Sequence, residues 1–385
     1  MRNETNCTIG RPERLRKTNP EEREREGLIP ETLTQDPKQS ATAAGLRYVS
    51  DDVPGISRKG RGDGFAYYHV GGRMVRSSSE LNRIRSLAIP PAWKNVWICK
   101  RSDGHLQATG IDARGRKQYK YHPDWRAIRD EVKYEKLMSF ARALPRIRAR
   151  VADDLQLPRL CREKVLATVV KLLEISLIRI GNDEYAQTNG SFGLTTMRNR
   201  HVEVEGSTVT FQFRGKSGKK HKIAVSDRRL ANTVRKCQDR PGQRLFEYTD
   251  SEGKIAEVCS EDVNEYLHAI SGHPFTAKDF RTWAGTVLAA IALGQMEEVD
   301  GTAAAKKNVI AAVEAVARML GNTAAICRKC YIHPAVITRY LDGKLAQTLR
   351  VKADSEISDH LHELKPEEAA VLSLLRGELD RRSES

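Results

Sequence analysis

The chain has 385 residues, a length that predicts two or three domains. Its 65 lysine and arginine residues outnumber its 50 aspartate and glutamate residues, and the formal net charge of +15 favours a polyanionic partner through counterion release. No apolar run approaches the roughly 20 residues that span a bilayer, and the odd, scattered set of seven cysteines does not suit a secreted disulfide framework. We therefore expect a soluble, cytoplasmic protein without a membrane partner.

The first 45 residues are predicted to form a charged, disordered extension and a linker. Residues 1–30 are rich in arginine, glutamate, asparagine and proline and contain almost no apolar side chains that could build a core. Residues 31–45 are interpreted as the linker.

Residues 46–122 have the pattern of a small domain made mainly of β-strands. Residues 65–70 and 73–75 flank Gly71-Gly72 and predict a hairpin, and a short helix is expected at 79–87. Further strands are predicted at 96–99, 105–110 and 117–122. In the last of these, Tyr119 and Tyr121 are two residues apart and share one face, while Gln118 lies on the other.

Residues 123–345 are predicted to form a larger, mainly helical domain. The apolar spacing predicts helices at 124–150, 159–180, 262–270, 277–293, 302–320 and 332–341. The second of these would carry Arg179 in its last turn, before Gly181-Asn182. A three-stranded meander is expected at 202–225, with Lys216 at the tip of its second hairpin. Residues 346–385 are expected to form a charged tail with one or two short helices.

The segment 320–331 organises the predicted site. Gly321 ends the preceding helix, because glycine adopts the left-handed conformation at no steric cost. Asn322, Arg328, Lys329 and Tyr331 follow it. A tyrosine beside two cations places a phenol where a phosphate could bind, so we interpret Tyr331 as a nucleophile toward a DNA phosphodiester.

Strand cleavage by a side chain has three requirements. Tyrosine can form the covalent intermediate, arginine can bind the non-bridging oxygens with its forked guanidinium, and lysine can protonate the leaving alkoxide. The chain offers Tyr331, Arg179, Arg281 and Lys216 for these roles. Each residue alone has an ordinary structural explanation, and the sequence does not show that the four converge.

Motifs in matching order make this chain resemble the poxvirus-type branch of the type IB DNA topoisomerases, in its bacterial form. The resemblance covers about residues 46–341. It rests on PPAW at 90–93, GHLQATG at 104–110, YKYHP at 119–123, LIRIGN at 177–182, FRGKSGK at 213–219, KDFRT at 278–282 and GNTAAICRKCY at 321–331.

The resemblance implies the reaction. Tyr331 would form a 3′-phosphotyrosyl bond, Arg179 and Arg281 would clamp the phosphate, and Lys216 would protonate the departing 5′ oxygen. The cut strand would swivel and be resealed, which relaxes supercoils without ATP, metal or any other cofactor. The implied fold is α+β: a small β-rich domain and a larger helical domain that form a clamp around duplex DNA. We expect a monomer associated with the nucleoid.

Asn322 departs from the family pattern, which commonly has histidine nine residues before the tyrosine. An asparagine amide can also donate a hydrogen bond, so we expect Asn322 to keep the phosphate contact. The resemblance further implies DNA contacts from Gln118, Tyr119 and Tyr121 in the β-rich domain and from Tyr185 and Lys278 near the cleavage site. The basic hairpin of Arg214, Lys216, Lys219, Lys220 and Lys222 also favours phosphate contact.

Two alternatives remain open at this point. A tyrosine recombinase uses the same chemistry, but it usually has histidine three residues before the second arginine, where this chain has Lys278. A DNA-binding protein with weak or no catalysis is suggested only by Asn322. A structural zinc site is disfavoured, because Cys327 and Cys330 form a single CxxC pair, followed by His333, and such sites normally use two pairs.

Overall fold

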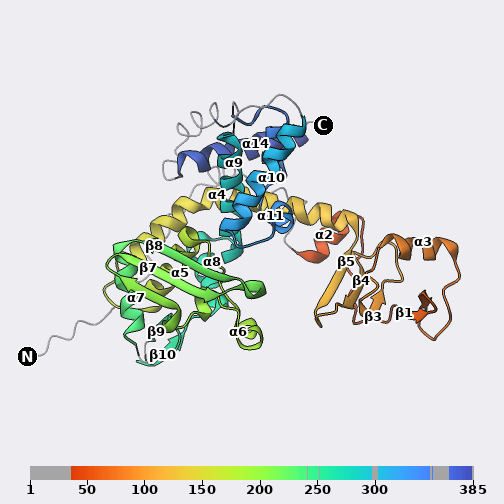
Figure 1. Ribbon diagram of the computed structural model, residues 1–385, viewed down its shortest axis with the longest axis horizontal. Helices are drawn as coiled ribbons and strands as arrows, with labels where there is room; N and C mark the ends of the chain where they lie inside the picture. The colour runs from red at the N-terminus through yellow and green to blue at the C-terminus, as the bar shows by residue number, and fades with distance from the viewer. Residues whose placement is uncertain are drawn as a thin grey trace, which may run out of the picture. The chain divides into compact units, whose positions relative to one another are not determined.

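Figure 1 shows the computed structural model, which describes residues 36–240, 242–250, 252–296, 302–346, 349 and 364–383. The chain divides into two units, residues 1–135 and 136–385. The boundary lies within helix α4 (Pro123–Asp154), which begins where the second domain is predicted to start. The extension predicted at 1–30 lies outside the described residues.

An antiparallel five-stranded sheet forms the centre of the first unit, with the strand order β2-β1-β3-β4-β5. Its strands are β1 (Ile56–Arg61), β2 (Gly64–Tyr68), β3 (Lys94–Ile98), β4 (Leu106–Ile111) and β5 (Lys117–Tyr121). The strands predicted at 96–99, 105–110 and 117–122 are confirmed. The buried side chains of Ile56, Ile98 and Ala108 pack with helix α3 (Ser78–Ser86), which confirms the predicted helix.

The first hairpin differs from the prediction. Strand β2 pairs with β1 rather than with residues 73–75, which contribute only a single bridge between Tyr68 and Met74. Strand β1 escapes the sequence pattern because Ile56 is its only large apolar residue and its only buried one. The predicted linker also contains structure: helix α2 (Pro37–Ala43) begins at the Asp36 cap and packs Ala41 against Trp125.

Helices dominate the second unit. They are α5 (Arg162–Ser176), α6 (Asp183–Asn189), α7 (Arg228–Gln238), α8 (Ser260–Ser271), α9 (Ala277–Gly294), α10 (Thr302–Met319), α11 (Ala324–Cys330), α12 (Pro334–Leu341) and α14 (Pro366–Ser383). The helices predicted around α4, α8, α9, α10 and α12 are confirmed, while α6, α7 and α11 were not predicted. Among the described residues no single helix is long and apolar enough to cross a membrane; α10 and α11 pass that test only as a pair bent by 94°.

Helix α5 ends earlier than predicted, so Arg179 does not lie in its last turn. Leu177 takes the left-handed conformation, with φ of 56°, and ends the helix at Ser176. The next residues pair with another segment: the carbonyls of Arg179 and Ile180 accept hydrogen bonds from the amides of Leu194 and Thr195. These tertiary hydrogen bonds replace the helical ones that the apolar spacing suggested.

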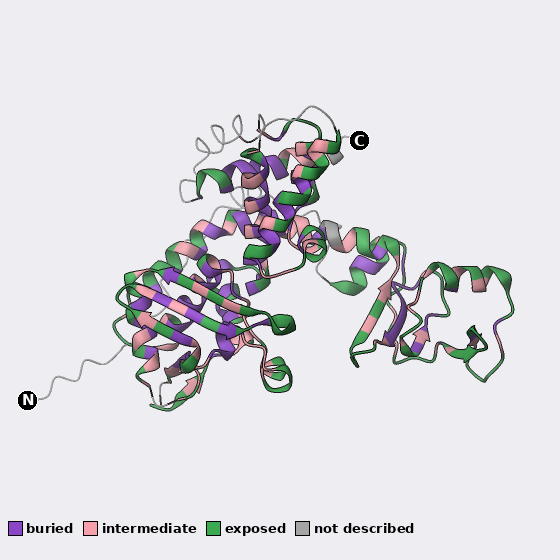
Figure 2. Ribbon diagram, in the orientation of Figure 1, coloured by how far each residue is buried: buried purple, intermediate pink, exposed green. Residues whose placement is uncertain are grey.

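The predicted three-stranded meander is confirmed as the antiparallel sheet β6 (Val202–Glu205), β7 (Thr208–Arg214) and β8 (Lys220–Ser226). Buried and more exposed residues alternate along β7, which shows as bands in Figure 2, and α7 packs on β6 and β7. Lys216 opens the short turn η3 (Lys216–Gly218) between β7 and β8, as predicted. The remaining strands form a small hairpin, β9 (Glu247–Thr249) and β10 (Ile255–Glu257).

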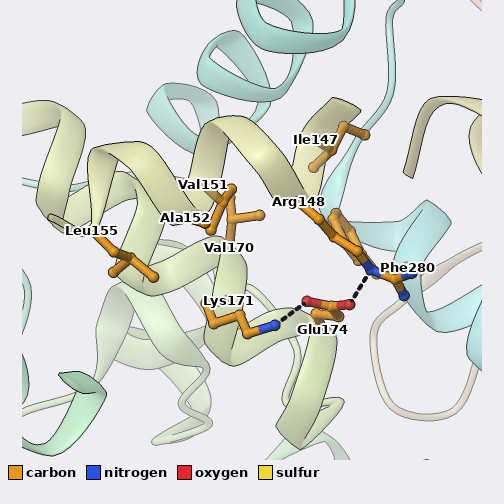
Figure 3. Close-up of a pocket in the computed structure, with 9 residues that line it drawn as sticks. All are labelled: Ile147, Arg148, Val151, Ala152, Leu155, Val170, Lys171, Glu174 and Phe280. Carbon is orange, nitrogen blue, oxygen red and sulfur yellow. Dashed lines mark hydrogen bonds and ion pairs between the residues drawn. The ribbon is translucent and has the colours of Figure 1, made fainter. Parts of the chain in front are cut away.

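Helix α14 is the described part of the predicted helical tail, and it packs against α9 and α12. Glu368 on α14 accepts two hydrogen bonds of 2.8 Å from Arg148 on α4 and one of 3.2 Å from the Trp283 indole on α9. Arg148 also pairs with Glu174 on α5, beside a small hollow whose walls include Ile147, Val151 and Phe280 (Figure 3). These contacts make α14 part of the helical core.

Candidate active site

The predicted nucleophile, Tyr331, follows a short helix. Gly321 has φ of 61°, as predicted for the end of α10, and Thr323 then caps α11 through a hydrogen bond from the Ile326 amide. Tyr331 ends α11, and its amide donates to the Cys327 carbonyl at 2.9 Å.

Helix α9 fixes the backbone of Tyr331. A Cβ atom at Gly285 would lie 2.6 Å from the Tyr331 carbonyl oxygen, so only glycine permits this approach. The buried Thr286 hydroxyl donates to the same carbonyl oxygen at 3.3 Å. It also accepts a hydrogen bond of 3.2 Å from the His333 amide. Arg281, one turn earlier on α9, has its guanidinium carbon 5.4 Å from the centroid of the Tyr331 ring. One helix therefore positions both the tyrosine and an arginine.

Arg281 is 4% exposed and joins two further segments of the chain. Its guanidinium donates to the Leu177 carbonyl after α5 and, at 2.6 Å, to the Leu320 carbonyl after α10. Burial, and next the charge of Arg179, lower the pKa of Arg281. Its Nε is buried and has no hydrogen-bond partner among the described residues.

Arg179 reaches the same place from the segment after α5. Its Nη2 donates to the side-chain oxygen of Asn322, and burial lowers its pKa. The Asn322 Nδ2 is buried without a hydrogen-bond partner among the described residues, while the Asn322 carbonyl accepts from the Lys219 ammonium at 3.2 Å. Asn322 thus keeps a free donor beside the two arginines.

Lys216 lines one small cavity together with Arg179 and Arg281, although its own side chain is exposed. Among the described residues no carboxylate forms an ion pair with either arginine, so the cations lie together without a counter-ion. Arg281 Nε and Asn322 Nδ2, two buried donors without a hydrogen-bond partner among the described residues, belong to this same cluster. Buried polar groups are normally paired, and this arrangement is suited to binding an anion such as a phosphodiester.

His221 on β8 belongs to this site, although the sequence analysis did not single it out. It lies opposite Phe213 in the β7–β8 register, and the two rings stack with centroids 5.1 Å apart. Its ring lines the same cavity as Lys216. The hairpin register around the Lys216 turn could have indicated it, because that register pairs residue 213 with residue 221.

The other predicted DNA-binding residues lie on both units. On β5, the Tyr119 and Tyr121 rings stack with centroids 6.0 Å apart, which agrees with one shared face, and Gln118 donates to Asp112 at 3.0 Å. In the second unit the described side chains at the remaining predicted positions are exposed: Tyr185 on α6, Lys219 and Lys220 at the β7–β8 turn, and Lys278 in the first turn of α9.

The cysteine pair of the Tyr331 segment holds free thiols. Cys327 is buried in α11, and burial raises its pKa to about 11. His333 uses Nδ1 to accept from the Ala335 amide at the start of α12. Within the described part of the chain, no three histidine, cysteine, aspartate or glutamate side chains gather as a possible metal site.

Comparison with known proteins finds two matching family models. The family model for the catalytic core of eukaryotic DNA topoisomerase I matches residues 122–356, and the model for the N-terminal domain of bacterial DNA topoisomerase IB matches residues 64–112. DNA topoisomerase 1B of Acanthamoeba polyphaga mimivirus is 30% identical over 287 residues, which cover 73% of this chain and 85% of the relative. DNA topoisomerase 1B of Vaccinia virus (strain Copenhagen) is 21% identical over 236 residues, covering 60% and 72%.

These matches span both units and include the cation cluster and Tyr331. A small β domain followed by a larger helical domain is also the arrangement that fits this family. The chain belongs to the type IB DNA topoisomerases.

Proposed function

We propose that this chain relaxes supercoiled duplex DNA by attaching one strand transiently to Tyr331. The observation that carries the proposal is the cluster of Arg179, Arg281 and Asn322, which lies next to the Tyr331 ring. Within the described part of the chain, this cluster offers two buried donors without a hydrogen-bond partner and has no carboxylate partner. A scissile phosphate would supply the missing anion.

In the proposed reaction, the Tyr331 phenolic oxygen attacks the phosphorus atom. A bond forms between this oxygen and phosphorus, the bond from phosphorus to the 5′ oxygen breaks, and the phenolic proton passes to solvent. Lys216 gives a proton to the departing 5′ oxygen. Arg179 and Arg281 bind the non-bridging oxygens, where negative charge builds up in the transition state. The reverse steps reseal the strand after rotation, so neither nucleotide nor metal is needed.

Asn322 is proposed to donate its Nδ2 hydrogen bond to a non-bridging oxygen. The amide is oriented for this role because its oxygen already accepts from Arg179. Asn322→Ala should slow strand cleavage at least about tenfold, the cost of a hydrogen bond to a charged group, whereas Asn322→His should cleave at the parent rate or faster. An alanine variant as fast as the parent would remove Asn322 from the mechanism.

Binding of duplex DNA is proposed to use both units as a clamp. The stacked Tyr119 and Tyr121 with Gln118 would contact the duplex from the first unit. Tyr185, Lys219, Lys220 and Lys278 would contact it from the second. We further propose that the protein acts as a monomer in the cytoplasm, on the DNA of the nucleoid.

The test is relaxation of supercoiled plasmid in chelator without nucleotide. The parent should relax the plasmid, and Tyr331→Phe should not. Tyr340→Phe is the matched control, because Tyr340 lies on the following helix, α12, and its hydroxyl accepts a hydrogen bond of 2.7 Å from Asn308. A parent protein that needs metal or nucleotide would contradict the mechanism. Strand exchange between two sites, in place of relaxation, would favour a recombinase.

A further inference from the structure

His221 lies between two turns of the chain. One carries Lys216, the proposed general acid, and the other carries Asn322, the proposed hydrogen-bond donor to the phosphate. A Cβ atom at Gly215, just before Lys216, would lie 2.8 Å from His221 Cδ2 and Nε2. A Cβ atom at Gly321, just before Asn322, would lie 2.6 Å from His221 Cε1. The backbone of each turn therefore rests directly on the imidazole ring, and neither turn could approach it as closely with a larger residue.

The His221 ring also packs on Phe213, and the two rings are nearly parallel, with an interplanar angle of 17°. No hydrogen bond of the His221 side chain is present among the described residues. Burial lowers its pKa, and the charges of Arg179, Lys219 and Arg281 lower it further. The ring is therefore neutral at pH 7, which lets a flat side chain lie among these cations, where a lysine or arginine would be repelled.

We propose that His221 is a positioning residue: its ring sets the distance between the Lys216 turn and the Gly321-Asn322 turn, and so aims Lys216 at the departing 5′ oxygen. This inference rests on the proposed function, because it assigns His221 to the proton-transfer step of that reaction. It acts through shape and stacking rather than through a bond to the substrate.

The first experiment measures the rate constant of covalent adduct formation on a short duplex under single-turnover conditions. His221→Ala should lower it roughly 10- to 100-fold, the typical cost of a small misplacement of reacting groups, while non-covalent DNA affinity, measured in the Tyr331→Phe background, stays at the parent value. His221→Phe should restore most of the lost rate, because a second phenylalanine can fill the same space and stack on Phe213. If the alanine variant is as fast as the parent, or the phenylalanine variant is as slow as alanine, the proposal is wrong.

The second experiment isolates the proton-transfer step with a duplex in which sulfur replaces the bridging 5′ oxygen. A thiolate leaves without an acid, because a thiol has a pKa of about 8.5, far below that of an alcohol. Lys216→Ala and His221→Ala should both regain most of their lost rate on this substrate. A defect of His221→Ala that persists on the sulfur substrate would overturn the assignment to Lys216.

His201→Ala is the matched control for loss of an imidazole. His201 is also half-buried, and its ring lies 4.4 Å from that of Phe192, but it touches neither glycine turn. It should cleave at the parent rate, and thermal melting of all variants identifies any that are unfolded. Failure of the parent to form an adduct, or failure of sulfur to rescue Lys216→Ala, would instead contradict the proposed function and not the role of His221 alone.

Discussion

Arginines that are partly or fully buried in the second unit differ in what compensates their charge. The first group is Arg148 with its carboxylate partners, and the second group is Arg179 with Arg281. Arg148 donates one hydrogen bond of 2.7 Å to Glu174 (Figure 3) and two of 2.8 Å to Glu368. All three nitrogens of its guanidinium therefore pair with carboxylates. Arg179 donates to the Asn322 side-chain oxygen, and Arg281 donates to the Leu177 and Leu320 carbonyls; among the described residues neither arginine pairs with a carboxylate.

The pKa values of the two groups move in opposite directions as a result. Burial alone would lower the pKa of Arg148, but its hydrogen bonds and charge interactions with Glu368 and Glu174 raise it above its ordinary value. The pKa values of Arg179 and Arg281 are lowered by burial, which no carboxylate among the described residues offsets. The first arrangement stabilises the fold, while the second tolerates uncompensated charge at a cost that a bound phosphate would remove.

Removing the carboxylate of the first group should have the largest effect on stability. Glu368→Ala removes two hydrogen bonds of the Arg148 guanidinium and the acceptor of the Trp283 indole. We expect the free energy of unfolding to fall by about 3–5 kcal/mol, measured by urea denaturation. Glu367→Ala, at the exposed neighbouring position on α14, should lie close to the parent. Equal stabilities of the two variants would show that the Arg148 group does not hold α14.

Removing an arginine of the second group should instead act on catalysis. Arg281→Ala should lower the cleavage rate constant about 10²- to 10³-fold, because the transition state loses a preorganised cation. Glu368→Ala, assayed at a temperature where it remains folded, should cleave at the parent rate. A fast Arg281→Ala variant would mean that the two groups do not differ in function.

Asn322→Asp would give the second group a carboxylate partner like those of Arg148 in the first group. The new carboxylate would pair with Arg179 in place of the amide oxygen and would repel the substrate phosphate. We expect the melting temperature to rise by about 2–4 °C, the equivalent of about 1 kcal/mol, and the cleavage rate constant to fall roughly 100-fold. A variant that melts lower than the parent would contradict the idea that the site lacks an anion.

Acidic pH should reduce the stabilisation that the Glu368–Arg148 ion pair gives to the fold. This is the smallest effect that we expect. Burial alone would raise the pKa of Glu368, but the hydrogen bonds and charge of Arg148 outweigh it, so the pKa lies below its ordinary value of 4.5. The stabilisation is therefore complete above about pH 4.5 and is lost as the pH falls through the folded-state pKa. Between about pH 6 and pH 3.5, the parent should lose more stability than Glu368→Gln, and equal losses would contradict the assignment.

Local patterns predicted much of this fold, and some of the misses occur where distant segments meet. Alternation and glycine turns identified the β6–β8 meander, and apolar spacing identified α9 and α10. The early end of α5 depends on hydrogen bonds from Leu194 and Thr195, which the local spacing at Ile178 and Ile180 cannot reveal. The pairing of Arg148 with Glu368 joins residues 220 positions apart.

The candidate site shows the same division. Residue chemistry and the resemblance selected Arg179, Lys216, Arg281, Asn322 and Tyr331 from the sequence. The orientation of the Asn322 amide and the contact of His221 with both glycine turns depend on atomic packing, so only the structure reveals them. Gly285 is a similar case, because its small size matters only where the Tyr331 backbone crosses α9.

The most direct test of the central claim is to identify the residue that becomes linked to DNA. The parent is mixed with duplex DNA in chelator without nucleotide and stopped with denaturant, and the adduct is digested and sequenced by mass spectrometry. We predict a single modified residue, Tyr331, bound to a 3′ phosphate and matched by a strand with a free 5′ hydroxyl. An adduct on another residue, a 5′-phosphate linkage, or cleavage without any attached protein would contradict it.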